Sequence, residues 1–138
     1  MNRKKSREVA MKLLFEISIN KNSVSEVIEN YKESNKSQNI DFGYVENTIN
    51  GIEENIDFID SKIEKSSNKW KMDRISKVNI AILRIAAYEI FFQNDIPYKV
   101  SANEAVELAK NYSEEKSFTF VNGVIGKLID SVDKKSQD

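Results

Sequence analysis

Residues 96–124 read IPYKVSANEAVELAKNYSEEKSFTFVNGV, and this stretch decides the fold more than any other. It holds the only proline of the chain, Pro97, which disfavours helix in the residue before it and so predicts a break in the chain direction. Ser101-Ala102-Asn103-Glu104 then has the Ser-x-x-Glu spacing of a helix capping box. We therefore expect one helix from Ser101 to about Asn111 and a last helix from about Ser117 onward.

The composition of the whole chain favours helices as well. Its 138 residues include one Pro and four Gly, so few residues interrupt helices and a many-turned β architecture is disfavoured. The length suits a single domain over residues 1–138, with 40% apolar and 31% charged residues as in ordinary globular proteins. Further helices are expected over about 6–20, 23–33, 42–63 and 76–93. Six or seven helices without strands predict an all-α helical bundle.

The helix expected over 42–63 has the clearest periodicity in the chain. Its apolar residues are spaced alternately by three and four positions, which makes a heptad seam with polar residues between. The seam consists of Phe42, Val45, Ile49, Ile52, Ile56, Ile59 and Ile63. Such a seam is typical of one helix of an intramolecular bundle, and the alternative is a coiled-coil homodimer. Gly43 and Gly51 lie off the seam and are expected to allow close helix approach.

Two charged residues interrupt the very apolar helix expected over 76–93. They are Arg84 and Glu89, and a charge on a buried helix must be paired or reach solvent. We expect Arg84 to pair with Glu89 or with Glu104.

Charge is unevenly distributed, although the formal net charge is only −1. Residues 1–12 carry five cations against a single acid, Glu8, and we expect residues 1–6 to form a flexible basic arm. An arm of this kind fits contact with an anionic polymer, and the alternative is a solvated tail without a binding role. A frayed tail is expected over 134–138.

The residue types that are missing narrow the chemistry. The chain has no His and no Cys, so the usual general base, thiol nucleophile and transition-metal ligands are absent. We therefore expect no enzyme activity, no metal site and no cofactor. No apolar run approaches the roughly 18 residues of a membrane span, and no signal-peptide core follows the basic N-terminus. These features predict a cytoplasmic protein without membrane contact.

Four ordered blocks within residues 82–124 closely resemble the NusB family. The blocks are RIAAYE at 84–89, IPYKV at 96–100, NEAVELAK at 103–110 and FVNGV at 120–124. The opening REVA at 7–10 also resembles the first helix of that family, so the resemblance spans essentially the whole chain. It implies an all-helical fold made of two small helical subdomains.

The resemblance also implies a transcription antitermination factor, whose activity is binding and not catalysis. Proteins of this family bind the boxA element of nascent RNA together with the ribosomal protein NusE, in a complex with RNA polymerase and other Nus factors. NusB-like domains also occur fused to RNA methyltransferases, but this chain has no glycine-rich strand-turn-helix for a cofactor. The alternative function is a helical protein-interaction module or homodimer without specific RNA binding.

The resemblance places the RNA surface on the basic arm and around the Phe-Val-Asn-Gly block. The implied RNA-binding residues are Arg3, Lys4, Lys5, Arg7, Lys99, Ser117 and Phe120. Trp70 lies among basic residues and is a further stacking candidate, and Lys116 adds a cation where relatives often carry an acid. Cations neutralise phosphates and exposed aromatic rings stack on unpaired bases. The alternatives are a core position for Phe120 and a packed lid for Trp70.

The resemblance implies that the surface for the partner protein includes the first helix and the start of the central helix. In this chain these positions are Phe15 and Asn79, and the alternative for Phe15 is burial within the domain. Gly123 is expected to let another helix approach closely.

Overall fold

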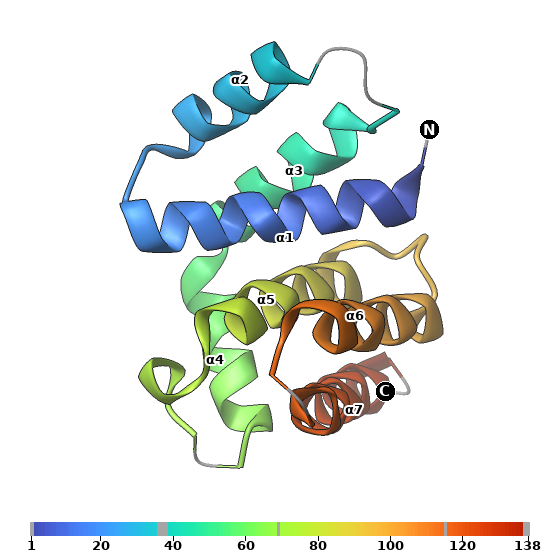
Figure 1. Ribbon diagram of the computed structural model, residues 1–138. Helices are drawn as coiled ribbons and strands as arrows, with labels where there is room; N and C mark the ends of the chain where they lie inside the picture. Colours follow the sequence, from blue (N-terminus) through green and yellow to red (C-terminus); the bar gives the residue numbers. More distant parts are fainter. Residues whose placement is uncertain (1, 36–38, 69, 115, 137–138) are drawn as a thin grey trace.

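The computed structural model describes residues 2–35, 39–68, 70–114 and 116–136, which form seven α-helices and one short 3-10 helix (Figure 1). The elements are α1 (Arg3–Asn20), α2 (Val24–Ser34), α3 (Phe42–Glu54), α4 (Ile56–Ser66), η1 (Met72–Arg74), α5 (Lys77–Phe92), α6 (Tyr98–Tyr112) and α7 (Ser117–Ser136). No strand occurs within these described ranges, so the all-α prediction is confirmed.

The helices form two groups that share α5. In Figure 1, α1, α2 and α3 make the upper group, and α4 to α7 make the lower group. α5 lies between them and packs on α1 and α3 above and on α4, α6 and α7 below. Its side chains are buried on nearly every side, because a helix in this position has neighbours all round. This arrangement agrees with the two helical subdomains that were expected.

α1 begins earlier than the sequence predicts. The side chain of Asn2 accepts a hydrogen bond from the backbone N–H of Lys5 at 2.9 Å and caps the helix, which therefore starts at Arg3. Ser6 is buried, donates to the Asn2 carbonyl at 2.8 Å, and accepts from the backbone N–H of Asp41 at 2.8 Å. Residues 3–6 are thus the first turn of a packed helix, whereas a flexible arm was expected. Residue 1 lies outside the described residues.

The helix expected over 42–63 is divided into two at Asn55. The Asn55 side chain donates to the Gly51 carbonyl at 2.8 Å and its backbone N–H donates to the same carbonyl at 3.2 Å, which ends α3. The heptad seam still faces inward on both helices, and its members Val45, Ile49, Ile52, Ile59 and Ile63 are fully buried within the chain. The intramolecular interpretation of the seam is confirmed, and the seam offers no stripe for a coiled-coil partner.

Gly51 and Gly123 were both expected to allow close helix packing, but their surroundings differ. A Cβ atom on Gly51 would lie 2.3 Å from a ring carbon of Tyr88, so a side chain at this position of α3 would force the end of the Tyr88 side chain on α5 to move. A Cβ atom on Gly123 would meet nothing within 4 Å, so the expected helix contact there is wrong.

α6 begins three residues before the expected capping box. Pro97 is its N-cap residue with φ −61° and ψ 141°, and the break before this proline is confirmed. Ser101 therefore lies inside the helix, where it is buried and donates a hydrogen bond to Glu89 at 2.7 Å. α7 begins at Ser117 as predicted, and its described backbone is helical through Ser136. The rest of the tail that was expected to fray, residues 137–138, lies outside the described residues.

Candidate nucleic-acid interface

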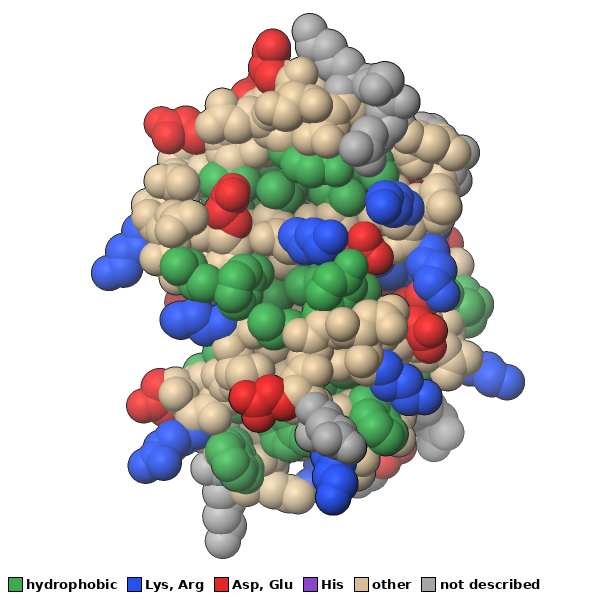
Figure 2. Space-filling model, viewed as in Figure 1, with side chains coloured by type: hydrophobic (Ala, Val, Ile, Leu, Met, Phe, Trp, Pro, Cys, Tyr) green, Lys and Arg blue, Asp and Glu red, His purple; other side chains and the backbone are tan. Residues whose placement is uncertain are grey.

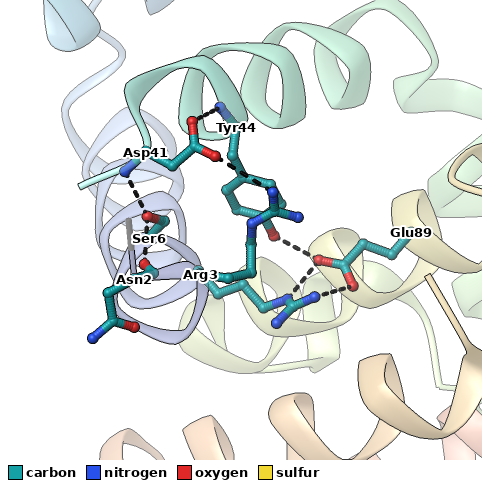
Figure 3. Close-up of polar contacts among 7 residues, drawn as sticks. Asn2, Arg3, Ser6, Asp41, Tyr44 and Glu89 are labelled. Carbon is teal, nitrogen blue, oxygen red and sulfur yellow. Dashed lines mark hydrogen bonds and ion pairs between the residues drawn. The ribbon is translucent and has the colours of Figure 1, made fainter. Parts of the chain in front are cut away.

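A buried polar network lies beneath the N-terminal end of α1. The Glu89 carboxylate accepts hydrogen bonds from Arg7 Nε at 2.8 Å and Nη2 at 3.1 Å and from the Tyr44 hydroxyl at 2.5 Å (Figure 3). It also accepts a hydrogen bond from Ser101 Oγ at 2.7 Å. Arg7 is 4% exposed and Glu89 is 1% exposed. The network joins α1, α3, α5 and α6. Arg7 was implied as an RNA contact, but the structure places its guanidinium in this interior network.

The network changes the protonation behaviour of its members. Burial alone would lower the pKa of Arg7, but the hydrogen bond and charge of Glu89 outweigh burial and the pKa is raised. The pKa of Tyr44 is raised strongly, first by burial and then by the negative charge of Glu89. Arg7 therefore stays charged and Tyr44 stays a neutral hydrogen-bond donor at physiological pH.

Four cations implied as RNA contacts lie together at one end of the molecule, which we call the basic end: Arg3, Lys4, Lys5 and Lys99. The starts of α1 and α6 both lie on the right in Figure 1. Lys4 shares a hollow with Val100, Glu104 and Glu107 of α6, and Lys99 is exposed next to Val100 in the sequence. The Arg3 guanidinium lies 4.4 Å from the centre of the Tyr44 ring and 3.4 Å from the Asp41 carboxylate. A polyanion at this end would meet exposed cations on two helices.

Trp70 and Phe120 form an aromatic ledge at the other end of the lower group. Their ring centroids are 6.1 Å apart with an angle of 59° between the planes, and Trp70 is 52% exposed. One side of the ledge borders a hollow of about 380 Å³ that also contacts Arg74, Lys116 and Ser117. Phe120 is half-buried, so its position is between the two expected alternatives of core and surface.

The other side of the ledge borders a smaller hollow of about 190 Å³. Asn68 and Lys127 line it, and the Lys127 ammonium donates to the Asn68 side chain. Sequence reasoning did not select Lys127 or Arg74. Arg74 belongs to a basic run that was visible in the sequence, whereas nothing in the local sequence of Lys127 marks it.

The two groups of candidate residues are separated along α6. Lys99 is in the first turn of this helix, and Ser117 follows its far end. A 15-residue helix is about 22 Å long, so the basic end and the aromatic ledge lie roughly that far apart. The structure thus places the candidate RNA residues on two surfaces of one molecule.

The two residues implied for the partner protein have different environments. Phe15 is half-buried on α1. Asn79 is 5% exposed, and its side-chain oxygen accepts a hydrogen bond from Ser113 Oγ at 2.5 Å, which ties α5 to the end of α6. Near α1, Lys12 lies 5.1 Å from the centre of the exposed Tyr112 ring, a pair that sequence reasoning missed. Figure 2 shows hydrophobic side chains along the junction of α1 with α5 and α6.

Arg84 has a different partner from those expected. Its guanidinium forms two hydrogen bonds with the Asp60 carboxylate, at 2.9 and 2.8 Å, and so joins α5 to α4. Asp60 lies on α4, which follows the unexpected break at Asn55. The direction in which Asp60 points could therefore not be predicted from the sequence. Within the described ranges, no cluster of acidic residues could hold a metal ion, and no helix has the length and apolar character to cross a membrane.

Comparison with known proteins gives this arrangement a family. The model of the NusB family matches residues 4–130. The chain belongs to the NusB family. The transcription antitermination protein NusB of Clostridium acetobutylicum is 72% identical over 135 residues, which covers 98% of this chain and 100% of that protein.

Solved NusB structures share the fold over nearly the full length. The NusB structure from T. maritima has 32% sequence identity and a TM-score of 0.84, with 94% of this chain and 92% of that chain covered. A crystal structure of the antitermination factors NusB and NusE in complex with dsRNA has 27% identity and a TM-score of 0.83, with 94% of this chain and 96% of that chain covered. The family expected from the sequence is therefore confirmed.

Proposed function

We propose that the protein is a transcription antitermination factor that binds boxA-type single-stranded RNA together with the ribosomal protein NusE. It acts within a complex with RNA polymerase and other Nus factors, and therefore in the cytoplasm. The observation that carries the proposal is the likeness, over 94% of the chain, to a NusB chain solved with NusE and dsRNA. The single-stranded form of the RNA is part of the proposal and rests on the two candidate surfaces. The activity is binding without catalysis.

The two candidate surfaces support RNA as the ligand. At the basic end, cations that neutralise phosphates release condensed counterions, which provides affinity without sequence selectivity. At the aromatic ledge, Trp70 presents an open ring face to unpaired bases, with Lys116 and Arg74 beside it for the backbone. Base stacking requires bases outside a duplex, which favours single-stranded RNA.

The partner surface is proposed along α1, where Phe15 and the apolar junction with α5 and α6 are partly open to solvent. Asn79 is buried, and we assign it an indirect role, because its bond to Ser113 orients the end of α6 next to this junction. Tyr112, stacked under Lys12, is the exposed aromatic residue at the same place.

Fluorescence anisotropy with labelled RNA tests the proposal. A boxA-type RNA and a scrambled RNA of equal composition are titrated with the protein, with and without NusE, over a series of salt concentrations. We expect NusE to increase the affinity for boxA-type RNA selectively, and we expect affinity to fall linearly with salt on logarithmic axes. Equal affinities for the two RNAs in the presence of NusE would overturn the proposal.

A further inference from the structure

A polar hollow of about 290 Å³ lies between the start of α1, the first turns of α3 and the connection from α5 to α6. Arg3, Asp41, Tyr44, Asn47, Gln93 and Asp95 contribute to its lining. Its volume is at the small end of ligand pockets, so it suits a fragment of the size of one nucleobase better than a larger molecule. It shares Arg3 with the basic end, but none of the three lysines of that end lines it.

Arg3 is held as a flat platform at the edge of this hollow. One face of its guanidinium covers the Tyr44 ring at 4.4 Å, and the Asp41 carboxylate lies 3.4 Å from its Nη2 atom (Figure 3). The Tyr44 ring is itself fixed by the hydrogen bond from its hydroxyl to Glu89. The Arg3 side chain is still 46% exposed, so it can accept a second planar group by stacking. Guanidinium planes are common stacking platforms for unpaired RNA bases.

The hollow also offers hydrogen-bonding groups with free capacity. The exposed Asn47 side chain has no hydrogen-bond partner in the described part of the chain. The side-chain nitrogen of Gln93 donates to the Tyr88 hydroxyl at 3.0 Å, which leaves its oxygen available as an acceptor. Asp95 is exposed and forms no ion pair with the described residues. An ionised carboxylate only accepts hydrogen bonds, whereas an amide both donates and accepts.

Charge argues against a phosphate in this position. Asp41 and Asp95 both line the hollow, and Asp41 already pairs with the one cation present, Arg3. A phosphate would meet two carboxylates and a neutralised guanidinium, while Lys4, Lys5 and Lys99 remain available outside the hollow. An uncharged base is therefore favoured inside, with its phosphates on the lysines.

We propose that this hollow binds one unpaired RNA base that carries an exocyclic amino group. The base stacks on Arg3, its amino group donates to Asp95 or Gln93, and Asn47 bonds to the remaining edge. Uracil lacks the amino group and is rejected. The inference rests on the proposed RNA-binding function and assigns part of its sequence selectivity to Asn47, Gln93 and Asp95.

A direct test uses uncharged nucleosides and does not depend on boxA. The side-chain amide signals of Asn47 and Gln93 are followed by NMR during titration with adenosine, cytidine or uridine at millimolar concentration. We expect these signals to move with adenosine or cytidine and to stay unchanged with uridine. The absence of any shift, or equal shifts with all three, would overturn the base pocket regardless of how the protein binds RNA.

A second test uses Asn47→Ala with Asn50→Ala as a matched control, because Asn50 is exposed on the same helix outside the hollow. A set of boxA-type RNAs is prepared in which each base with an exocyclic amino group is replaced in turn by uracil. Each RNA is titrated with both variants in the presence of NusE. We expect Asn47→Ala to weaken binding of the parent RNA about tenfold. It should have no effect on the one RNA in which the base that enters the hollow has been replaced by uracil. The slope of affinity against salt should not change, because no phosphate contact is lost.

The outcomes of this second test separate the pocket from the proposed function. If the unmodified protein prefers boxA-type RNA and Asn47→Ala binds all RNAs as Asn50→Ala does, the pocket is wrong while the function stands. A uniform loss for all RNAs with a reduced salt slope would make Asn47 a backbone contact and would also overturn the pocket. If the unmodified protein shows no preference for boxA-type RNA, the proposed function fails, and the nucleoside titration alone decides the pocket.

Discussion

At the residue scale, Glu89 is the most connected polar group in the described structure. Its carboxylate receives hydrogen bonds from three other helices, through Arg7, Tyr44 and Ser101. A buried charge of this kind is tolerated because each of its oxygens is satisfied and its partner is a cation. The same completeness makes the site sensitive to a change in any member.

Replacement of Glu89 by Gln is expected to lower the free energy of unfolding by about 3–5 kcal/mol. The variant leaves the buried Arg7 guanidinium with only the more distant carboxylate of Glu104, 3.8 Å away, and introduces an N–H group where every neighbour already donates. Urea unfolding followed by circular dichroism measures the loss. Glu107→Gln is the control, because Glu107 is exposed on α6 and its substitution should change stability by less than about 0.5 kcal/mol. Equal stabilities of the two variants would contradict the assigned role of Glu89.

The raised pKa of Tyr44 predicts that the protein loses stability in alkaline solution. Its pKa is raised in the folded state above the ordinary value of 10, so folding favours the protonated phenol. This contribution is complete below pH 10 and is lost as pH rises from 10 toward the raised folded-state pKa, with a limiting slope of about 1.4 kcal/mol per pH unit. The free energy of unfolding, measured in urea between pH 7 and 11, should therefore fall above pH 10.

Tyr44→Phe is the matching variant for this pH dependence. It loses the hydrogen bond to Glu89 and should be less stable at pH 7 by about 1.5–3 kcal/mol. Its stability should nevertheless decline less steeply above pH 10, because the ionisable hydroxyl is gone. Parallel pH profiles for the two proteins would show that Tyr44 does not carry the effect.

At the element scale, Gly51 and Gly126 have different surroundings, and replacing each by Ala should change stability in opposite directions. Gly51→Ala places a methyl group 2.3 Å from the Tyr88 ring and should cost about 1–3 kcal/mol, since the buried Tyr88 side chain must shift to make room. Gly126→Ala adds a methyl group in open space within α7 and should stabilise the protein by about 0.5–1 kcal/mol. Thermal unfolding of both variants provides the check, and a stabilising Gly51→Ala would contradict the close approach.

The elements themselves show which features could be predicted from the sequence. Apolar spacing and capping signals located six helical segments that together cover the seven described α-helices, because apolar spacing follows directly from which face of a helix is buried. The break at Asn55 was missed, since the heptad seam continues across it without a change of phase and only the cap at the Gly51 carbonyl reveals it. The Ser101 capping box was a false signal, because the same hydroxyl serves Glu89 inside the helix.

Only part of the candidate site could be predicted from the sequence. The family resemblance implied Phe120 and the lysines as RNA contacts, and the cations around Trp70 suggested that residue. Neither showed which of these residues meet in space. Arg7 resembled its neighbours in the basic run, and its burial depends on Glu89, which lies 82 residues away in the chain. Burial of a charged residue is decided by such distant partners, so local sequence could not separate Arg7 from Lys4.

At the scale of the whole molecule, the separation of the basic end from the aromatic ledge predicts additive effects on RNA binding. Lys4→Ala should weaken binding and reduce the salt slope by about one unit. Trp70→Ala should cost about 1–3 kcal/mol of binding free energy without changing that slope. The double variant should lose the sum within about 0.5 kcal/mol, because residues this far apart share no contacts.

Anisotropy titrations with boxA-type RNA and NusE measure these effects. Lys62→Ala serves as the control for a lost cation, because the Lys62 ammonium lies over the rings of Phe58 and Phe91 and Lys62 lines none of the hollows at the two surfaces. A marked departure from additivity would mean that the two surfaces respond to each other through the fold.

The position of α4 also has a consequence for the order in which the chain is made. Ile59 and Ile63 on this helix are fully buried, and the helices that cover them most extensively, α5 and α7, are both synthesised later. At roughly 5–20 residues per second, the ribosome needs on the order of several seconds to complete these helices. During that interval α1, α2 and α3 can already pack on one another, while the isoleucines of α4 face water. The nascent chain thus passes through a stage at which α4 is the segment most open to chaperones or to aggregation.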